Sequence, residues 1–274
     1  MSANREKDPL DGDQYPDRVY YAEGVLLGAV DFGDEQNYHR GRLARALACL
    51  CGSGTVSGLR VEYKGPKGPD EEIIVHAGLA IDRLGRLIEL PRDACIRLDG
   101  WYRSQTATDL AEGFHAAAGG VIADVFIRFM ACERGKTPAF AAGPFDATDY
   151  VTPSRLRDGY HLDLVIRKEA KPGLPQSSLP DLAGESDPAK RRAALHQMIF
   201  DSWNAPGRNR DQNGLVPLAE HAANQNTAAV FLARLIIPAA AGNPPLRTAA
   251  AITPDNDSRA FAYSLSGLAR WLGI

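Results

Sequence analysis

Apolar and polar positions alternate with different periods along the chain, and they predict one helix followed by a group of strands. From residue 31 to 51, apolar side chains recur at helical spacing. Residues 54–63, 71–82 and 85–91 carry short alternating runs between glycine and proline turns, which is typical of antiparallel strands. Residues 94–103 would close this group. The clearest alternation, over residues 121–131, predicts a strand with one well-buried face.

The second half of the chain mixes strands, helices and irregular segments. Residues 135–153 indicate a long loop, and residues 154–169 and 227–238 indicate strands. Residues 187–204 predict a helix with Asp187 or Ser186 as its cap and Pro188 in its first turn. An amphipathic helix over residues 257–274 would place Phe261, Leu265, Leu268 and Leu272 on one stripe.

This order of elements favours an α+β fold over a doubly wound α/β sheet. We expect an antiparallel, β-rich fold, a small sandwich or a barrel-like sheet, with a capped N-terminal helix and C-terminal helices. Proline, serine and glycine dominate residues 170–190, which predicts a linker. In chain order, we expect a flexible arm over 1–17, a helix plus antiparallel β domain over 18–169, the linker over 170–190, and a helical and β region over 191–274 that packs on the first domain.

Composition and charge are those of an ordinary globular chain. The 274 residues are 45% hydrophobic, enough to bury a core without a disulfide or a metal. A net charge of −3 provides no basic excess, so we expect no nucleic-acid partner. No apolar run approaches the roughly 20 residues of a membrane span, and residues 1–18 contain no apolar signal segment. We therefore expect a protein that is cytoplasmic when made, with reduced cysteines and no membrane insertion.

Residues 29–47 spell two protein-kinase motifs but do not form a kinase site. The letters Asp-Phe-Gly at residues 31–33 match the metal-binding loop, and His-Arg-Gly at residues 39–41 differs by one letter from the catalytic loop. Their order is the reverse of the kinase order, and the second motif lacks the catalytic Asp. Only about 30 residues precede them, too few for a nucleotide-binding lobe.

The same stretch is better interpreted as a capped helix. Asp31 would accept hydrogen bonds from the free N–H groups of the first turn, and Phe32 would be the first apolar anchor. Gln36 and His39 interrupt the apolar stripe, and we predict that backbone groups of residues 52–58 are their partners. A glycine at position 52 or 54 would end the helix. The stripe consists of Phe32, Leu43, Leu47 and Leu50.

Two glycine-containing segments are better interpreted as turns than as binding loops. In the turn over residues 82–85, Asp82 can bond its own downstream backbone and Gly85 can adopt a positive φ. Residues 52–58 resemble a phosphate-binding loop only in composition. They lack Gly-Lys-Ser/Thr, and the helix precedes them instead of following them.

Glu35 and His39 are the strongest metal-ligand candidates. They stand four residues apart, so on a helix they share a face, and His76 and Asp82 could approach from the strands to complete a site. The spacing is not His-Glu-x-x-His, and Cys49-x-Cys51 lacks a matching pair. A local Glu–His pair on a solvated face is the plainer interpretation.

Two further sets of residues have the side-chain types that nucleophilic catalysis requires. Ser154, His161 and Asp163 are the residue types of a catalytic triad, but no Gly-x-Ser-x-Gly elbow is present. Cys132 could act as a nucleophile near His115, although a free cysteine at a strand end is usually inert. Surface and packing roles are the alternative for both sets.

Three motifs follow one another between about residues 30 and 166. A helix begins Asp-Phe-x-x-Glu-Gln-x-Tyr and is followed by Gly-x-Gly-x-Val-x-Gly-Leu; a Gly-x-Ala-x-Asp hairpin ends Gly-Arg-x-Ile-x-x-Pro; a strand carries Ser-Arg-x-Arg-x-Gly-Tyr. This arrangement resembles a loosely defined set of uncharacterised bacterial proteins encoded with phage-tail-like contractile particles, near baseplate components. The matching residues are Asp31, Phe32, Glu35, Gln36, Tyr38, Gly52, Gly54, Val56, Gly58, Leu59, Gly78, Ala80, Asp82, Gly85, Arg86, Ile88, Pro91, Ser154, Arg155, Arg157, Gly159 and Tyr160.

The resemblance implies a structural or accessory piece of a tail-like machine and no known reaction. This sequence departs from the set where His-Asn and His-Gly often follow the helix: residues 46–47 are Ala-Leu and residues 51–52 are Cys-Gly. A metal or catalytic role that depended on those histidines would be absent here. We expect no cofactor.

The sequence therefore predicts a non-enzymatic component of a contractile particle, at its baseplate or tail tip, that acts through protein–protein contacts. Expected partners are other tail or baseplate proteins, with self-association as a further option. Residues 1–17 and 170–190 are candidate docking segments. One alternative is a metal-dependent hydrolase that uses Glu35, His39 and His76. Another is a carbohydrate-binding β module, whose candidates are Trp101, Trp203 and Trp271. The residues expected to specify the fold are Asp31, Phe32, Glu35, Gln36, His39, Gly58, Asp82, Gly85, Arg155 and Tyr160.

Overall fold

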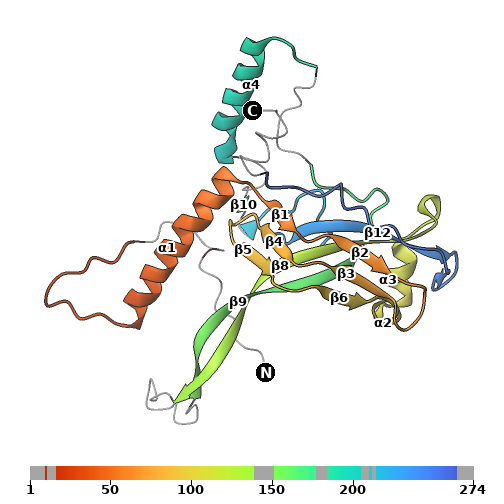
Figure 1. Cartoon of the computed structure of the whole chain (residues 1–274), viewed down its shortest axis with the longest axis horizontal. Helices are drawn as coiled ribbons and strands as arrows, with labels where there is room; N and C mark the ends of the chain where they lie inside the picture. Colours follow the sequence, from red (N-terminus) through yellow and green to blue (C-terminus); the bar gives the residue numbers. More distant parts are fainter. Residues whose placement is uncertain are drawn as a thin grey trace.

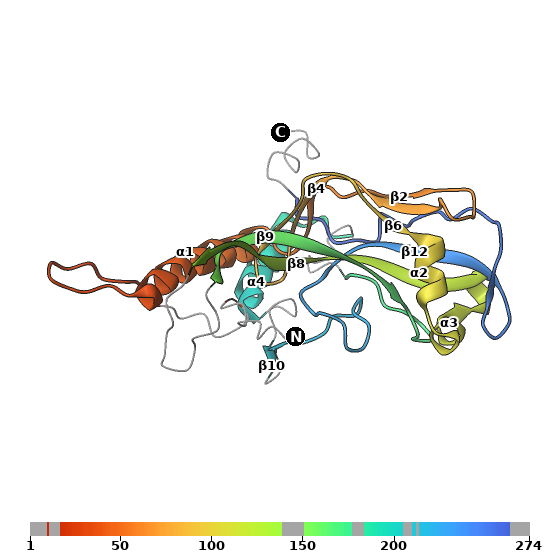
Figure 2. The same cartoon turned by 90° about the horizontal axis from the view of Figure 1, so that it is seen from below.

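A body of two β layers carries two helices and a two-stranded ribbon that extend away from it (Figure 1, Figure 2). The computed structural model describes residues 10, 17–138, 151–176, 184–204, 210–211 and 214–263. The fold is mixed α+β with a β-rich core, as predicted, and the described strands form no closed barrel.

One layer is a sheet in the order β13-β12-β8-β7, with β9 also paired to β8. β12 lies antiparallel along one side of β8, while β7 and then β9 lie along the other. The strands predicted over residues 121–131, 154–169 and 227–238 are all present in this sheet. The bounds are β7 Phe114–His115, β8 Gly120–Pro138, β9 Val151–Ile166, β12 Val230–Ala240 and β13 Leu246–Arg247.

The second layer consists of two three-stranded sheets, β1-β4-β5 and β2-β3-β6. β1 runs into β2 through Gly58 and Leu59, which both have positive φ, and β3 runs into β4 through residues 76–77. A Cβ at Gly58 would overlap the carbonyl oxygen of Ala77, so this bend requires glycine. The bounds are β1 Gly54–Gly58, β2 Val61–Lys64, β3 Glu72–Val75, β4 Gly78–Ile81, β5 Leu87–Leu90 and β6 Ala94–Arg97.

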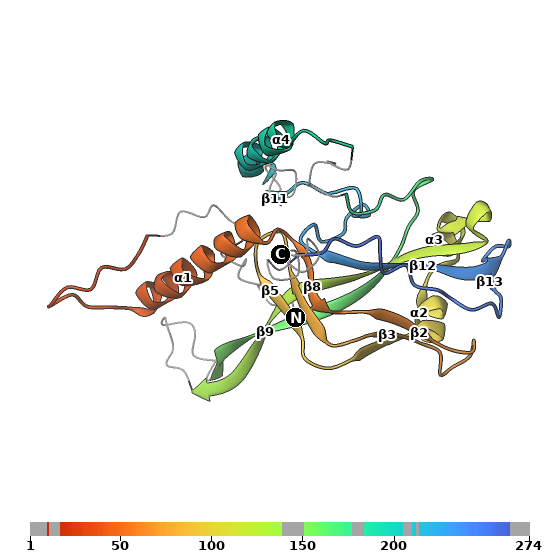
Figure 3. The ribbon, with the colours of Figure 1, turned by 45° about the horizontal axis from the view of Figure 1, so that its top comes forward.

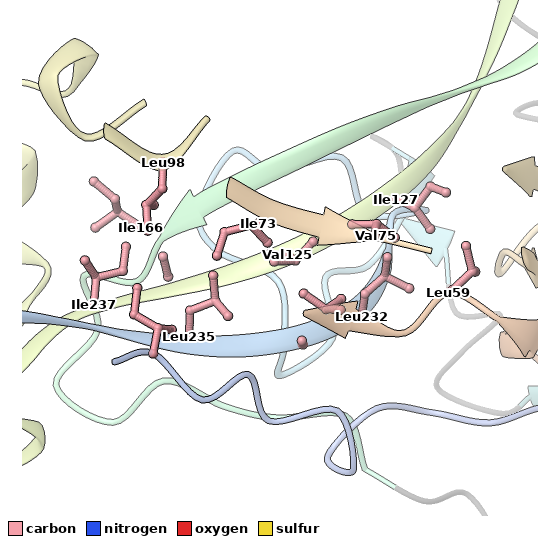
Figure 4. Close-up of a cluster of buried hydrophobic side chains, with 14 of the residues drawn as sticks. Leu59, Ile73, Val75, Leu98, Val125, Ile127, Ile166, Leu232, Leu235 and Ile237 are labelled. Atoms are coloured by element: carbon pink, nitrogen blue, oxygen red, sulfur yellow. The ribbon is translucent and has the colours of Figure 1, made fainter. Parts of the chain in front are cut away.

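The main apolar core fills the space between the two layers. Ile73 and Val75 of β3 point toward Val125 of β8 and toward Leu232 and Leu235 of β12 (Figure 4). Each such fully buried aliphatic side chain contributes about 1.5–3 kcal/mol relative to exposure. The other face of β8 is covered as well, because Phe126 packs with Phe231 and Leu174 in a second cluster. The prediction of a single buried face for this strand is therefore wrong over residues 120–127, which are buried on both faces.

Four short helical segments and two longer helices complete the described structure. Thr106 caps α3, because its hydroxyl accepts a hydrogen bond from the Asp109 N–H at 3.0 Å. Asp187 caps α4 as predicted, since its carboxylate accepts from the Ala189 N–H at 2.8 Å. The bounds are α1 Ala29–Leu50, α2 Leu98–Ser104, α3 Ala107–Glu112, η2 Ala116–Ala118, α4 Pro188–Asp201 and η3 Ser202–Asn204, with a β10–β11 hairpin at Arg210–Asp211 and Gly214–Leu215.

Three sequence predictions of secondary structure are corrected. The strand predicted over 94–103 ends at Arg97, where α2 begins and buries Leu98 and Tyr102, four residues apart, on one face. The loop predicted over 135–153 is strand up to Pro138 and again from Val151. The helix predicted over 257–274 is absent over 257–263, and residues 264–274 lie outside the described part.

The missing C-terminal helix has a local cause. The Asp255 carboxylate accepts hydrogen bonds from the N–H groups of Asp257 and Ser258, at 3.0 and 3.1 Å, which holds the backbone in a turn. Ala262 then donates its N–H to the carbonyl of Thr55, at 2.9 Å, so the chain here pairs with β1. Residues 1–9 and 11–16 of the flexible N-terminal segment predicted over 1–17 also lie outside the described residues, as do residues 177–183 of the predicted linker.

Candidate protein–protein interface

Helix α1 meets the body near its C-terminal end and projects from it over most of its length (Figure 1, Figure 3). Only Gly41 and Ala44 of its 22 residues are buried. The turn at Gly85 receives the helix: Gly85 has a φ of +83°, and a Cβ there would overlap the Ala44 carbonyl oxygen. α1 is therefore a rod of about 33 Å attached at one end.

The turn that receives α1 is built by Asp82, as the sequence predicts. This fully buried carboxylate accepts hydrogen bonds from the N–H groups of Leu84 and Arg86, each at 2.9 Å. It also accepts one from the Arg86 guanidinium at 2.7 Å. Because charge-assisted hydrogen bonds from inside hold this loop rigid, α1 packs against a fixed turn at Gly85.

The start of α1 differs from the predicted cap. Gly28 is the N-cap, and Asp31 lies in the first turn, where its carboxylate accepts from the Gly28 N–H at 2.7 Å. Phe32 is not an apolar anchor, because 55% of it is exposed. Cys51 caps the C-terminal end, followed by Gly52 with a φ of +73°, so the predicted glycine stop is confirmed.

Most of the predicted apolar stripe of α1 faces solvent, and only Leu47 of it is half-buried. Gln36 is exposed, and the His39 side chain is 68% exposed, paired with Glu35 at 2.8 Å. The prediction that His39 contacts the backbone of residues 52–58 is therefore wrong. Apolar residues of α1 and of the preceding segment are largely exposed: Tyr20, Tyr21, Val25, Leu26, Leu27, Val30, Phe32, Leu43 and Leu50. Monomeric proteins rarely leave such a series uncovered, so α1 is a candidate docking element.

The outer part of the β8–β9 ribbon, residues 131–138 with 151–158, is a second projecting element, which we name the arm. Residues 131–138 and 153–158 are all exposed, whereas residues 120–127 of the same strand are buried. Figure 3 shows the arm and α1 leaving the same end of the body in different directions. Arg155 lies on the arm, and Tyr160 lies at its base, half-buried against the core.

Helix α4 is a third element with little burial, since none of its residues is buried. Leu195, Ile199 and Phe200 are exposed along it, and Trp203 in the following 3-10 turn is 62% exposed. The Arg45 guanidinium lies over the Trp203 ring, 4.8 Å from its centroid, and links this region to α1.

The metal-site candidates are not brought together. Glu35 and His39 bond one another on α1, while His76 lies between β3 and β4 in the body. Its ring nitrogens contact Glu62 at 3.2 Å and Asp93 at 2.9 Å. The hydrogen bonds that its ring donates to these two carboxylates, first of all to Glu62, raise the pKa of His76. Among the residues that the structure describes, no group of three or more His, Cys, Asp or Glu side chains could hold a metal ion.

The nucleophile candidates are also separated. Ser154 lies on the opposite face of β9 from His161 and Asp163, and seven strand residues from the nearer one correspond to about 23 Å. His115 pairs with Gly120, twelve residues before Cys132 on β8, or about 40 Å away. Both sets therefore lack the geometry for catalysis.

The tryptophans and the glycine-rich turn have structural surroundings. Trp101 donates its Nε1–H to the Leu164 carbonyl at 3.1 Å and packs against the core. Trp271 lies outside the described residues. In the glycine-rich turn, the Thr55 N–H donates to the Ala260 carbonyl at 2.9 Å, so this backbone pairs with the C-terminal segment.

Sequence reasoning missed the charge arrangement of the arm. Arg134 and Lys136 stand two residues apart, as do Arg155 and Arg157, and this spacing places each pair on one strand face. The signal is visible in the sequence. Its meaning depends on the register of β8 against β9, which a long predicted loop concealed.

Comparisons with known proteins give no family. No protein-family model matches the chain, and no curated protein matches it. In the part of the chain that the structure describes, no helix is both long enough and apolar enough to cross a membrane.

Proposed function

We propose that this chain is a non-enzymatic structural or accessory component of a phage-tail-like contractile particle, located at its baseplate or tail tip. The observation that carries the contact role is the exposure of apolar side chains on α1 and in the segment before it, including Leu26 at 95%. Burying such surface in a partner is favourable by about 25 cal/mol per Å². The connection to contractile particles rests on the three-segment resemblance.

The mode of action is docking through elements that project from a rigid body. α1 is fixed at Gly85, and β8 continues from the core into the arm without interruption. A rigid attachment reduces the ordering cost of binding, because the docking element is already in its bound shape. Partners are other tail or baseplate proteins, which assemble with the chain in the cytoplasm.

Co-purification tests this function. Contractile particles would be isolated from producing cells by sedimentation and probed for the chain, with sheath and baseplate proteins as markers. We expect the chain to sediment with intact particles and to be lost after Leu26→Ser with Phe32→Ser. Leu246→Ser, an exposed apolar residue on β13 of the body, is the matched control. A wild-type chain that is absent from washed particles would contradict the proposal.

A further inference from the structure

The arm carries a one-sided cluster of cations, which follows from its register. Arg134 is directly opposite Arg155, Cys132 is opposite Arg157, and Lys136 is opposite Pro153. Directly opposite residues of an antiparallel pair share a face, and residues two apart along a strand share it as well. The four cations Arg134, Lys136, Arg155 and Arg157 therefore lie on one face, which we name the basic face.

The acids of the arm lie on the other face. Glu133 is opposite Leu156, and Asp158 is opposite Ala131, one residue out of phase with the cations. Among the described residues, none of the four cations forms an ion pair with a carboxylate. Like charges directly opposite one another, as in Arg134 and Arg155, destabilise a strand pair. An acidic partner would neutralise this repulsion, which explains why the end of a projecting ribbon carries such a face.

An acidic segment of matching size lies on the other projecting element. Residues 19–39 contain the four acids Glu23, Asp31, Asp34 and Glu35 and no lysine or arginine. Asp31, Asp34 and Glu35 are spaced three and four residues apart, so they share one face of α1. The same segment exposes Tyr20, Tyr21 and Phe32, whose rings are surfaces on which guanidinium groups stack.

The charge balance favours a second copy over a nucleic acid as the occupant. The whole chain carries −3, and the arm, with four cations and two acids, carries +2, which leaves −5 on the remainder. A phosphate backbone that approached the basic face would meet this negative remainder. The basic face of another copy's arm is attracted to this negative remainder.

We infer that two copies form a two-fold dimer in which the basic face of each arm docks on the acidic segment 19–39 of the other. Both elements leave the same end of the body (Figure 1, Figure 3), so one two-fold axis can form both contacts at once. The inference rests on the proposed function and names one partner for it. At each contact, basic side chains of the arm face acidic side chains of segment 19–39, and arginine stems cover the exposed aromatic rings.

Light-scattering mass measurements on the purified full chain test the dimer. At about 50 mM salt the wild type should have twice the monomer mass of 29.6 kDa, and it should dissociate at about 0.5 M salt because screening weakens exposed charge pairs. Arg134→Glu with Arg155→Glu reverses the arm, and Asp34→Lys with Glu35→Lys reverses the helix. Each variant alone should raise the dimer dissociation constant at least about 100-fold.

Mixing the two reversed variants gives the decisive result. The reversed arm of one variant attracts the reversed helix of the other, and the second contact is between wild-type partners, so the mixture should form a heterodimer although neither variant self-associates. Because recovery requires both chains to be folded, it separates lost contact from misfolding. Thr137→Glu with Ser154→Glu is the control: it places two negative charges on the other face of the arm and should leave the dimer intact.

Several results would overturn the dimer. These are a wild type that stays monomeric at low salt, a mixture that does not associate, and a control variant that dissociates as far as the arm variant. A monomeric wild type that binds a DNA or RNA duplex through Arg134 and Arg155 would assign the basic face to nucleic acid instead. Particle co-purification is scored separately, so a monomer that still sediments with particles removes the dimer and leaves the proposed function standing.

Discussion

β8 is one continuous strand whose two halves have different surroundings. In the inner half, residues 120–127, both faces are buried, and the one charged residue, Asp124, is bonded to Arg167 and Arg234. In the outer half, residues 131–138, both faces are exposed and the charges have no carboxylate or cation partner within the described chain. The comparison separates charges that hold the fold from charges that are available to a partner.

The inner half shows what a satisfied buried charge requires. Asp124 accepts from Arg234 Nε and Nη2, each at 2.8 Å, and from Arg167 at 2.5 Å. The two guanidinium groups continue to the carbonyls of Pro172, Gly173 and Glu220, which attaches the segment after β9 to the sheet. Each group in this network has partners, so its role is internal.

The largest expected effect comes from breaking the inner network. Asp124→Asn removes the negative charge between two guanidinium groups and should lower the free energy of unfolding by about 3–5 kcal/mol. Glu133→Gln is the matched change in the outer half and should stay within about 0.5 kcal/mol of wild type. Urea unfolding measures both. Equal losses from the two variants would remove the distinction between the halves.

A second prediction tests whether the covered face of the inner half is dry. His221 stacks on Phe126, accepts from the Leu218 N–H at 3.0 Å through Nδ1, and contacts the Ala229 carbonyl through Nε2. Burial, with a smaller contribution from Arg83 and Arg167, lowers its pKa to about 4. The neutral ring is therefore the form that the folded protein holds.

The sign of the pH effect follows from this lowered pKa. In the unfolded chain the imidazole titrates near its ordinary value of about 6.5, so below that pH the unfolded state binds more protons. Its stabilising contribution is present above pH 6.5 and is lost as pH falls toward 4, by about 3 kcal/mol in all. His221→Asn keeps an acceptor for Leu218 and should flatten the profile between pH 7 and 4. Burial raises the pKa of neighbouring Glu220, which titrates in the opposite sense and is common to both proteins.

A third, smaller effect tests the single attachment of α1. Gly85→Ala places a Cβ where the Ala44 carbonyl lies and, at positive φ, should cost about 1–3 kcal/mol. Amide hydrogen exchange should increase in α1 more than in β12. Gly33→Ala, where nothing lies within 4 Å of the new methyl group, should instead slow exchange along the helix by removing a flexible residue. Faster exchange spread evenly over the body would contradict a one-ended attachment.

The smallest effect is expected on the arm. Leu156 is 68% exposed, so Leu156→Ser should change the free energy of unfolding by less than about 0.5 kcal/mol. Leu235→Ser, fully buried in the neighbouring part of the sheet, is the contrasting change and should cost several times more. Thermal unfolding measures both. A large loss at Leu156 would show that the arm supports the body.

The positions of the strands can be predicted from the sequence, because alternation of apolar and polar residues is a local signal. The runs at 54–63, 71–82 and 227–238 contain strands, although each of the first two is divided between two sheets, and the turn chemistry of Asp82 and Gly85 is as predicted. The direction in which α1 faces was not predictable in the same way. A stripe such as Phe32 and Leu43 predicts a covered face, and the sequence pattern is the same whether the cover comes from this chain or from another.

Long-range pairs were also beyond sequence reasoning. Glu71 receives the guanidinium of Arg247, 176 positions further on, and Asp124 receives that of Arg234, 110 positions further on. Nothing in either local pattern identifies the partner. The basic face was missed for a related reason, because the strands extend past the predicted loop boundary by residues 135–138 and 151–153.

Covalent footprinting of the chain within its assembly, compared with the purified chain in high salt, tests the central claim that the projecting elements are the contact surface. Carboxylate and arginine labelling would be read at Asp34 on α1 and Arg155 on the arm, with Arg103 on α2 as the reference on the body. The account predicts strong protection of Asp34 and Arg155 and unchanged labelling of Arg103. Protection of Arg103 with Asp34 and Arg155 labelled as in the free chain would contradict it.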